Sequence, residues 1–293
     1  MIKIYAVLLF GIFSVSVASI IIKLTYDVPA LIMSTYRLVI SSVILIGISY
    51  FKKKSVRLSS RKELFVAILS GFFLSIHFIS WIASIKYTSI ASSVTLVSTS
   101  PIFVLLFSVF ILKEKQDTKT VLAVLGSVVG SALIAFSDSG MITGSFDKKA
   151  LLGDILALIG AIAVSIYFMA GSFLRKSIDT FHYITLVYSF AAFFSLLFAV
   201  ASGESFIGYR PVSYLYMILL ALVPQLLGHT SFNWALKHLK ANAVAISTLG
   251  EPIGASVLAY LFFSQTVGVG QLIGMAIVLV SIVVAVKSGY KEA

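Results

Sequence analysis

Long apolar runs restrict the fold of this chain more than any other feature of its sequence. A helix that crosses the hydrocarbon core of a bilayer needs about 20 predominantly apolar residues. Ten runs of about this length, separated by short polar segments, account for nearly all of the 293 residues. We predict spanning helices at residues 4–22, 30–51, 64–85, 90–112, 119–137, 151–172, 182–201, 213–236, 241–263 and 269–287. The sequence therefore indicates an all-α polytopic membrane protein with ten transmembrane helices.

Composition and charge distribution support this interpretation. Charged side chains make up 11% of the chain, whereas soluble globular proteins contain about 25%. With the N-terminus inside, 16 of the 22 lysines and arginines fall in inner segments and 5 in outer loops, while Arg37 lies within a span. Because cytoplasmic loops carry the excess of basic residues, we expect a multi-pass protein of the cell inner (cytoplasmic) membrane with both termini cytoplasmic. The net charge of +11 thus reflects topology, and we expect no nucleic-acid partner.

Sequence motifs of several enzyme classes are missing. The chain has no cysteine and four scattered histidines, which argues against a thiolate nucleophile or a structural metal site. It contains neither a Gly-x-x-x-x-Gly-Lys-Ser/Thr loop for ATP phosphates nor a His-Glu-x-x-His zinc motif. We therefore expect no enzymatic activity, no cofactor and no metal.

The two halves of the chain share landmarks in the same order. In each half a tryptophan lies about 20 residues before a proline, and a Gly-x-x-x-Gly motif follows. These landmarks are Trp81, Pro101 and Gly126–Gly130 in the first half and Trp234, Pro252 and Gly270–Gly274 in the second. A repeat of five helices is odd in number, so the second copy must enter the membrane from the opposite face. We predict two inverted five-helix repeats, residues 1–146 and 147–293, in the manner of secondary transporters. The glycine motifs predict close helix packing, with a homodimer as the alternative use.

These features resemble the EamA family of the drug/metabolite transporter superfamily. The resemblance rests on ten spans in two halves and on four segments: Ser89–Ser93, Ser98-Thr99-Ser100-Pro101, Lys240–Ala243 and Leu249-Gly250-Glu251-Pro252. It implies that helices 1 to 4 and 6 to 9 surround a central cavity, with Glu251 at that cavity and helices 5 and 10 at the periphery. Family members often end helices 4 and 9 with Leu-Gly-Glu. This chain departs from that pattern, with Leu112-Lys113-Glu114 and Phe263-Ser264-Gln265.

Two charged residues within the predicted spans are candidate site residues, because an ionisable group in the membrane is costly unless it meets a partner or a wet cavity. Glu251 shares a narrow polar face with Ser247 and is suited to bind a substrate ammonium or a proton; a structural carboxyl is the alternative. Arg37 is suited to clamp a carboxylate or to gate the outer side. Its alternative is to extend along the helix to the outer interface.

Polar and aromatic side chains form two further stripes at helical spacing. His77 and Trp81 lie on the third span, and Gln225, His229 and Asn233 lie on the eighth. We predict that both stripes face the cavity, His77 in its outer half and His229 in its inner half, although packing histidines would give the same pattern. Pro101 and Pro252 predict bends or breaks in the fourth and ninth spans, because proline removes a backbone hydrogen bond and clashes with the preceding turn.

The sequence as a whole favours a secondary transporter that moves a small metabolite by alternating access. An amino acid is the preferred substrate, because the predicted cavity combines one acid, one base, two imidazoles and aromatic rings. Export is the preferred direction, since EamA relatives often export amino acids and metabolites. Multidrug or organic-cation efflux is the alternative, and an intramembrane enzyme or a receptor is the alternative class. We expect the partners to be the small-molecule substrate and the lipid bilayer, with proton coupling left open.

Overall fold

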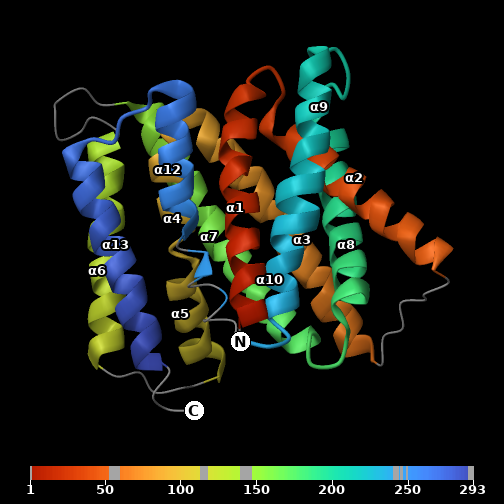
Figure 1. The fold of residues 1–293 in the computed structure, drawn as a ribbon, viewed down its shortest axis with the longest axis horizontal. Coiled ribbons are helices and arrows are strands. Elements are labelled where there is room, and N and C mark those ends of the chain that lie inside the picture. The colour runs from red at the N-terminus through yellow and green to blue at the C-terminus, as the bar shows by residue number, and fades with distance from the viewer. Residues whose placement is uncertain are drawn as a thin grey trace.

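The computed structural model describes residues 2–52, 60–112, 118–138, 147–239, 244, 247–248 and 250–289, and this part of the chain folds into helices without a strand (Figure 1). The helices of the first half are α1 (Ile2–Leu24), α2 (Ala30–Phe51), α3 (Arg61–Tyr87), α4 (Ile90–Val97), α5 (Ser100–Leu112) and α6 (Thr118–Asp138). Those of the second half are α7 (Lys148–Leu174), α8 (Thr180–Ser202), α9 (Pro211–Leu220), the π-helix η1 (Ala221–His229), α10 (Thr230–Ala235), α12 (Gly250–Phe263) and α13 (Val269–Gly289).

The predicted all-α polytopic fold is confirmed. Seven helical segments are long and apolar enough to cross a membrane. Three shorter apolar helices, at residues 121–134, 250–263 and 269–281, lie in the remaining predicted spans. The first part of the ninth predicted span lies largely outside the described residues.

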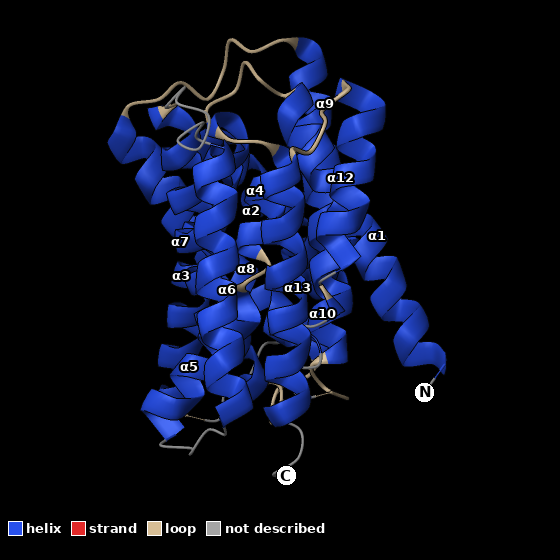
Figure 2. Ribbon diagram, turned by 90° about the vertical axis from the view of Figure 1, so that its left-hand side faces the viewer, coloured by secondary structure: helices blue, strands red, loops and turns tan. Residues whose placement is uncertain are grey.

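Helix contacts repeat in a twofold manner between the two halves. Helix α3 packs against α7 as η1 and α10 pack against α1, and α4 packs against α7 as α12 packs against α1. The pairs α2–α8 and α6–α13 each join equivalent helices of the two halves. Helix α1 begins and α13 ends toward the same, lower side of the bundle (Figures 1 and 2). The molecule is thus built from two inverted five-helix repeats.

The fourth span is interrupted where the sequence places Pro101. Helix α4 ends at Val97, four residues before this proline, and α5 begins at Ser100. Val97 carries the carbonyl that an uninterrupted α-helix would pair with the missing N–H of Pro101, so the break lies where the hydrogen bond cannot form. In the second repeat Pro252 lies in the first turn of α12, where proline is tolerated.

The eighth span contains a π-helix that the sequence analysis did not predict. Segment η1 continues α9 and leads into α10, and Pro224 lies inside it. Proline cannot donate a backbone hydrogen bond, so the regular α-helical ladder is interrupted there. Short π-helical segments shift the faces of the residues that follow and often occur at functional sites.

The two Gly-x-x-x-Gly motifs face each other within one chain. Helices α6 and α13 pack together at one flank of the bundle (Figure 1). A Cβ atom at Gly130 would lie 2.9 Å from the backbone oxygen of Gly274, and one at Gly274 would lie 2.8 Å from that of Gly130. The glycines therefore allow the two backbones to approach closely, as expected for small residues at helix interfaces in membranes.

Candidate functional site

A small cavity lies between the two repeats. Its volume is about 40 Å³, enough for about three water molecules. Every helix of the predicted inner ring except α8 contributes to its lining. The lining residues are Val15, Ala18, Arg37, His77, Trp81, Val97, Ser98, Ser100, Val164, Phe168, His229, Phe232, Thr248 and Glu251. The central cavity implied by the sequence is thus present, and it is narrow in this conformation.

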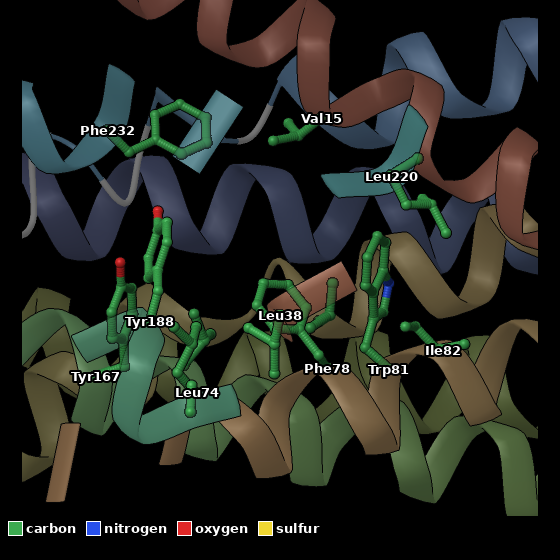
Figure 3. Close-up of a cluster of buried hydrophobic side chains, with 14 of the residues drawn as sticks. Val15, Leu38, Leu74, Phe78, Trp81, Ile82, Tyr167, Tyr188, Leu220 and Phe232 are labelled. Carbon is green, nitrogen blue, oxygen red and sulfur yellow. The ribbon is translucent and has the colours of Figure 1, made fainter. Parts of the chain in front are cut away.

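Aromatic rings form much of the wall. Figure 3 shows Trp81 projecting from α3, with Val15 and Phe232 across from it; all three residues line the cavity. The ring of Trp81 is stacked parallel to that of His77, with centroids 6.0 Å apart. Such rings offer flat apolar faces to a bound solute and can also stabilise a cation above them.

Arg37 is buried beside this wall. Its side chain has no exposed surface, which excludes the alternative in which it extends to the outer interface. Nε donates a hydrogen bond to Oε1 of Gln225 at 2.8 Å, and the guanidinium carbon lies 3.9 Å from the centroid of the Phe78 ring. Nη1 and Nη2 find no hydrogen-bond partner among the described residues. The structure therefore holds a permanently charged group at the cavity with part of its donor capacity unused.

Glu251 supplies the opposite charge at the start of α12. Its backbone N–H donates to the carbonyl of Thr248 at 2.9 Å, which forms the turn before the helix. Glu251 and Thr248 both line the cavity. Ser247 was predicted to share this face, but it does not contribute to the lining; Thr248 does so in its place.

His77 and His229 meet across the repeat interface. The centroids of their rings are 6.3 Å apart, and both rings line the cavity. The structure thus brings the two rings together at one cavity, and their placement in outer and inner parts of a path stays a prediction. Nδ1 of His77 is bonded to the carbonyl oxygen of Gly160 at 2.9 Å. Nδ1 of His229 has no partner among the described residues.

Two residues of the predicted stripe on the eighth span lie beside the cavity rather than in its lining. Gln225 does not line the cavity itself but accepts a hydrogen bond from Arg37, which does. Asn233 lies in a buried polar cluster, where its amide accepts from the hydroxyl of Tyr167 at 2.8 Å and donates to that of Tyr188 at 3.2 Å. The stripe was predicted from a uniform α-helical rotation, which η1 does not follow. The structure thus places Asn233 outside the lining of this cavity.

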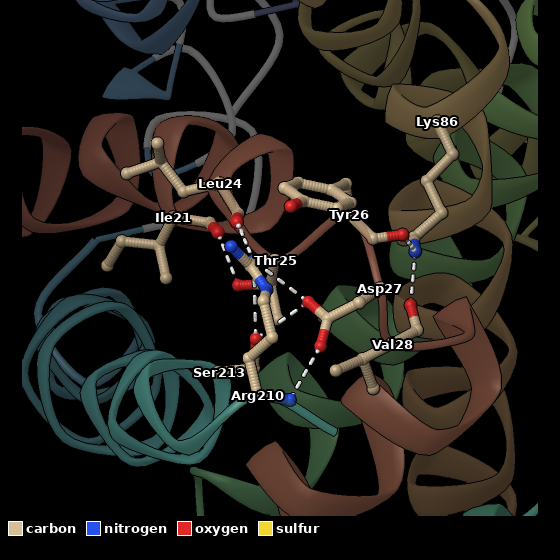
Figure 4. A network of polar contacts seen from close by, with 9 residues as sticks. All are labelled: Ile21, Leu24, Thr25, Tyr26, Asp27, Val28, Lys86, Arg210 and Ser213. Carbon is tan, nitrogen blue, oxygen red and sulfur yellow. Dashed lines mark hydrogen bonds and ion pairs between the residues drawn. The ribbon is translucent and has the colours of Figure 1, made fainter. Parts of the chain in front are cut away.

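Polar contacts bridge the two repeats at the end of the bundle opposite the first residues of α1 (Figure 4). Arg210 Nη2 and Ser213 Oγ donate to Asp27 Oδ1 at 2.9 and 2.7 Å, and the backbone N–H of Arg210 donates to Asp27 Oδ2 at 3.0 Å. Partial burial raises the pKa of Asp27, but these hydrogen bonds outweigh it and hold the pKa well below its usual range. The carboxylate therefore stays ionised and keeps the bridge at neutral pH.

A second bridge joins the repeats at the other end of the bundle. The hydroxyl of Ser177, in the segment between α7 and α8, donates to Oε1 of Glu63 on α3 at 2.7 Å. The segment between α1 and α2, which carries Asp27, is its equivalent in the other repeat. Both ends of the bundle are thus held together across the repeat interface, which agrees with the small volume of the cavity.

Several lining residues were not singled out from the sequence. Val15 and Ala18 on α1 and Val164 and Phe168 on α7 are ordinary apolar residues, and no local pattern distinguishes them. Ser98 and Ser100 belong to the Ser98-Thr99-Ser100-Pro101 segment noted in the sequence, and they lie at the break between α4 and α5. Within the described residues, no cluster of three or more His, Cys, Asp or Glu side chains could hold a metal ion.

Comparison with known proteins decides the family. The model of the EamA-like transporter family matches residues 2–136 and again residues 151–287. The chain belongs to this family. EamA proteins form part of the drug/metabolite transporter superfamily, so the resemblance noted in the sequence is confirmed. The two matches fall one in each predicted repeat.

Similar EamA relatives carry transporter names. The uncharacterized transporter YetK of Bacillus subtilis is 26% identical over 262 residues, covering 88% of this chain and 79% of the relative. Solute carrier family 35 member G1 of Mus musculus is 26% identical over 263 residues, covering 86% and 70%. One crystal structure covers 99% of both chains with a TM-score of 0.67 at 18% identity, a likeness that concerns the fold alone. The chain is accordingly a membrane transporter.

The backbone at the end of α12 shows why glycine suits the position at which this chain departs from the family pattern. Ser264, which stands where family members often have glycine, adopts a positive φ of 52°. This left-handed conformation at the end of a helix is the one that glycine adopts without strain. The first-repeat equivalents, Lys113 and Glu114, lie outside the described residues.

Proposed function

We propose that this protein is a secondary transporter that exports a small zwitterionic metabolite, an amino acid or a close relative, across the cytoplasmic membrane. One observation carries the proposal. The cavity at the interface of two inverted repeats is lined by one guanidinium, Arg37, and one carboxyl group, Glu251, with aromatic rings between the repeats. Opposite charges at one cavity match a solute that carries a carboxylate and an ammonium group, and burial makes unmatched solutes costly.

The charged side chains that line the cavity favour some substrates over others. A lipophilic cation would gain from the aromatic wall, but it would meet the fixed positive charge of Arg37. A large phosphorylated solute would need more than one cation to balance its charge. The aromatic lining keeps organic-cation efflux as the second candidate, and a small zwitterion satisfies both charges.

Alternating access follows from the symmetry of the scaffold. Two opposed copies of one unit can rock about a site at their interface and open it first to one side and then to the other. The Asp27–Arg210 and Glu63–Ser177 contacts join the repeats at opposite ends of the bundle. Parting of one contact at a time would open the site to one side and then to the other.

Proton coupling has a candidate carrier in Glu251. A carboxyl group at a buried cavity can exchange a proton for a substrate ammonium, because both bind the same oxygen atoms. In such an exchange, a proton that moves inward down its gradient would accompany an outgoing solute. If a proton gradient has no effect on the transport rate, the protein is a facilitator that moves its solute down the concentration gradient of that solute.

Flux into proteoliposomes tests the proposal. The purified protein is reconstituted, and uptake of labelled L-amino acids and of a labelled organic cation is measured with and without a pH gradient. We expect saturable flux of at least one amino acid and none of the cation. Cation flux without amino-acid flux would reverse the ranking. The absence of any solute flux would contradict the assignment and favour a receptor or an intramembrane enzyme.

A further inference from the structure

The hydrogen bonding of Arg37 is incomplete in a way that indicates a missing acceptor. The side chain is 0% exposed, yet Nη1 and Nη2 find no partner among the described residues. A buried charge without hydrogen-bond partners is costly, because the lost hydration is not replaced. About three waters can enter the cavity, but water leaves the charge unbalanced. The site is therefore suited to an anion that enters from outside the chain.

Neighbouring groups fix the direction in which the free donors lie. Gln225 on the π-helix accepts from Nε through Oε1 at 2.8 Å, and the Phe78 ring covers one face of the guanidinium at 3.9 Å. The Nε hydrogen and one flat face are thus already used. What remains is the edge formed by Nη1 and Nη2, whose in-plane N–H groups match two oxygens of a planar acid.

Glu251 does not satisfy this edge. It lines the same cavity as Arg37, but no ion pair between these two described residues is present, and both Nη atoms stay unpartnered. A guanidinium and a carboxyl group held at one cavity without pairing leave a place for a molecule that pairs with each. Arg37 would take the acidic end of that molecule and Glu251 the basic end.

We propose that Nη1 and Nη2 of Arg37 form a carboxylate subsite for the transported solute, and that Gln225 is the positioning residue that aims the guanidinium. The inference rests on the proposed function and narrows it: the solute must carry a carboxylate. A single permanent cation matches a monoanion, so a phosphate dianion would be left with excess charge. An amide of the same shape keeps one carbonyl oxygen but loses the charge and the second acceptor.

Trp81 offers a direct optical readout. The chain has two tryptophans; Trp81 lines the cavity, and its ring lies 5.9 Å from the guanidinium carbon of Arg37. Trp234 is not part of the lining. In a Trp234→Phe background, the fluorescence of Trp81 reports binding at the cavity. The full-length protein in nanodiscs is titrated with common L-amino acids, then with the carboxamide of the tightest binder and with the amine that lacks its carboxyl group.

We expect the amino acid to bind at least tenfold more tightly than its carboxamide or the corresponding amine, since charge-assisted hydrogen bonds are the strong ones. Arg37→Lys keeps the charge but loses the two-pronged edge, so the dissociation constant should rise about tenfold to 100-fold. Arg61→Lys is the matched control. Arg61 is exposed at the start of α3, and its exchange should leave binding unchanged.

Gln225→Ala tests the positioning role. It should reduce the preference for acid over amide, and it should also lower the unfolding temperature, because Nε of the buried Arg37 loses its acceptor. A variant that only loosens the fold would lower the unfolding temperature and leave the acid-to-amide ratio intact.

Equal binding of acid and amide by the parent protein would overturn the carboxylate subsite and leave transport untouched. This measurement needs no variant at position 37, so poor folding of Arg37→Lys does not affect it. If no amino acid alters either Trp81 fluorescence or thermal unfolding, while an organic cation does, the proposed function itself fails. The two failures are therefore distinguishable.

Discussion

Replacing Gly130 by alanine should weaken the packing of α6 on α13, and the size of the effect can be worked from the structure. The added Cβ would lie 2.9 Å from the backbone oxygen of Gly274 and 2.9 Å from Cγ2 of Val278. Backbone cannot rotate away, and overpacking of this kind costs about 1–3 kcal/mol. Alanine returns about 0.5–1 kcal/mol through its better helix propensity. The net expectation is a destabilisation of about 1 kcal/mol, within a range of about 0–2.5 kcal/mol.

Gly47 provides the matched control. It lies within α2, and a Cβ there would meet nothing within 4 Å. Gly47→Ala should therefore leave stability unchanged or raise it by about 0.5–1 kcal/mol. At about 2–4 °C per kcal/mol, the apparent unfolding temperature of Gly130→Ala should fall by about 2–4 °C, and by no more than about 10 °C, relative to the parent protein.

Thermal unfolding followed by tryptophan fluorescence, with molecular mass measured by light scattering, separates the two uses of the motif. If Gly130 packed at a homodimer interface rather than against α13, Gly130→Ala would change the measured molecular mass and would not change the unfolding temperature of the monomer. An unfolding temperature equal to that of Gly47→Ala would refute the packing argument.

Three further predictions concern transport and topology. Glu251→Gln keeps the shape of the side chain and removes its charge. The variant should either bind substrate more weakly or transport it at a rate that no longer depends on pH between about 5 and 8. Transport equal to that of the parent protein at every pH would make the carboxyl group structural. Asp27→Asn should loosen the bridge to Arg210 and speed solute exchange from that end. Because the pKa of Asp27 is lowered, the bridge is complete above the usual aspartate range and weakens only as the pH falls below it, so the effect of Asp27→Asn should be the same at every pH from about 5 to 8. A pH-dependent effect in that window would contradict this. The chain has no cysteine, so single cysteines can be introduced at Arg61 and Lys148 and labelled with an impermeant reagent. We expect the first to react only from the cytoplasm and the second only from outside. Labelling of both from one side would overturn the topology.

Much of the fold follows from the sequence because membrane helices need long apolar runs and the two halves repeat their landmarks. The break before Pro101 is predictable, since proline removes a hydrogen bond at a known position. The π-helix is not, although Pro224 lies within it. Proline forces an interruption, but tertiary packing decides whether the chain bends, breaks or widens its turn.

The candidate site was predictable in part for similar reasons. Arg37, Glu251 and the two histidines stand out because ionisable groups are rare inside spans. The position of Asn233 beside the cavity did not follow from the sequence, because a uniform rotation of 100° per residue does not hold through η1. Apolar lining residues such as Val15 and Phe168 became visible only once the repeats were packed together.

A single cysteine inside the cavity tests the central claim most directly, namely that one site between the repeats opens alternately to the two sides. Ser98 lines the cavity, and Ser98→Cys is a change of one atom in a chain without native cysteine. In sealed vesicles of known orientation, the rate of its reaction with an impermeant thiol reagent is measured from each side in turn, with and without a transported amino acid. The account predicts reaction from both sides, slowed by the amino acid. Reaction from one side alone, at a rate that the solute does not change, would contradict it.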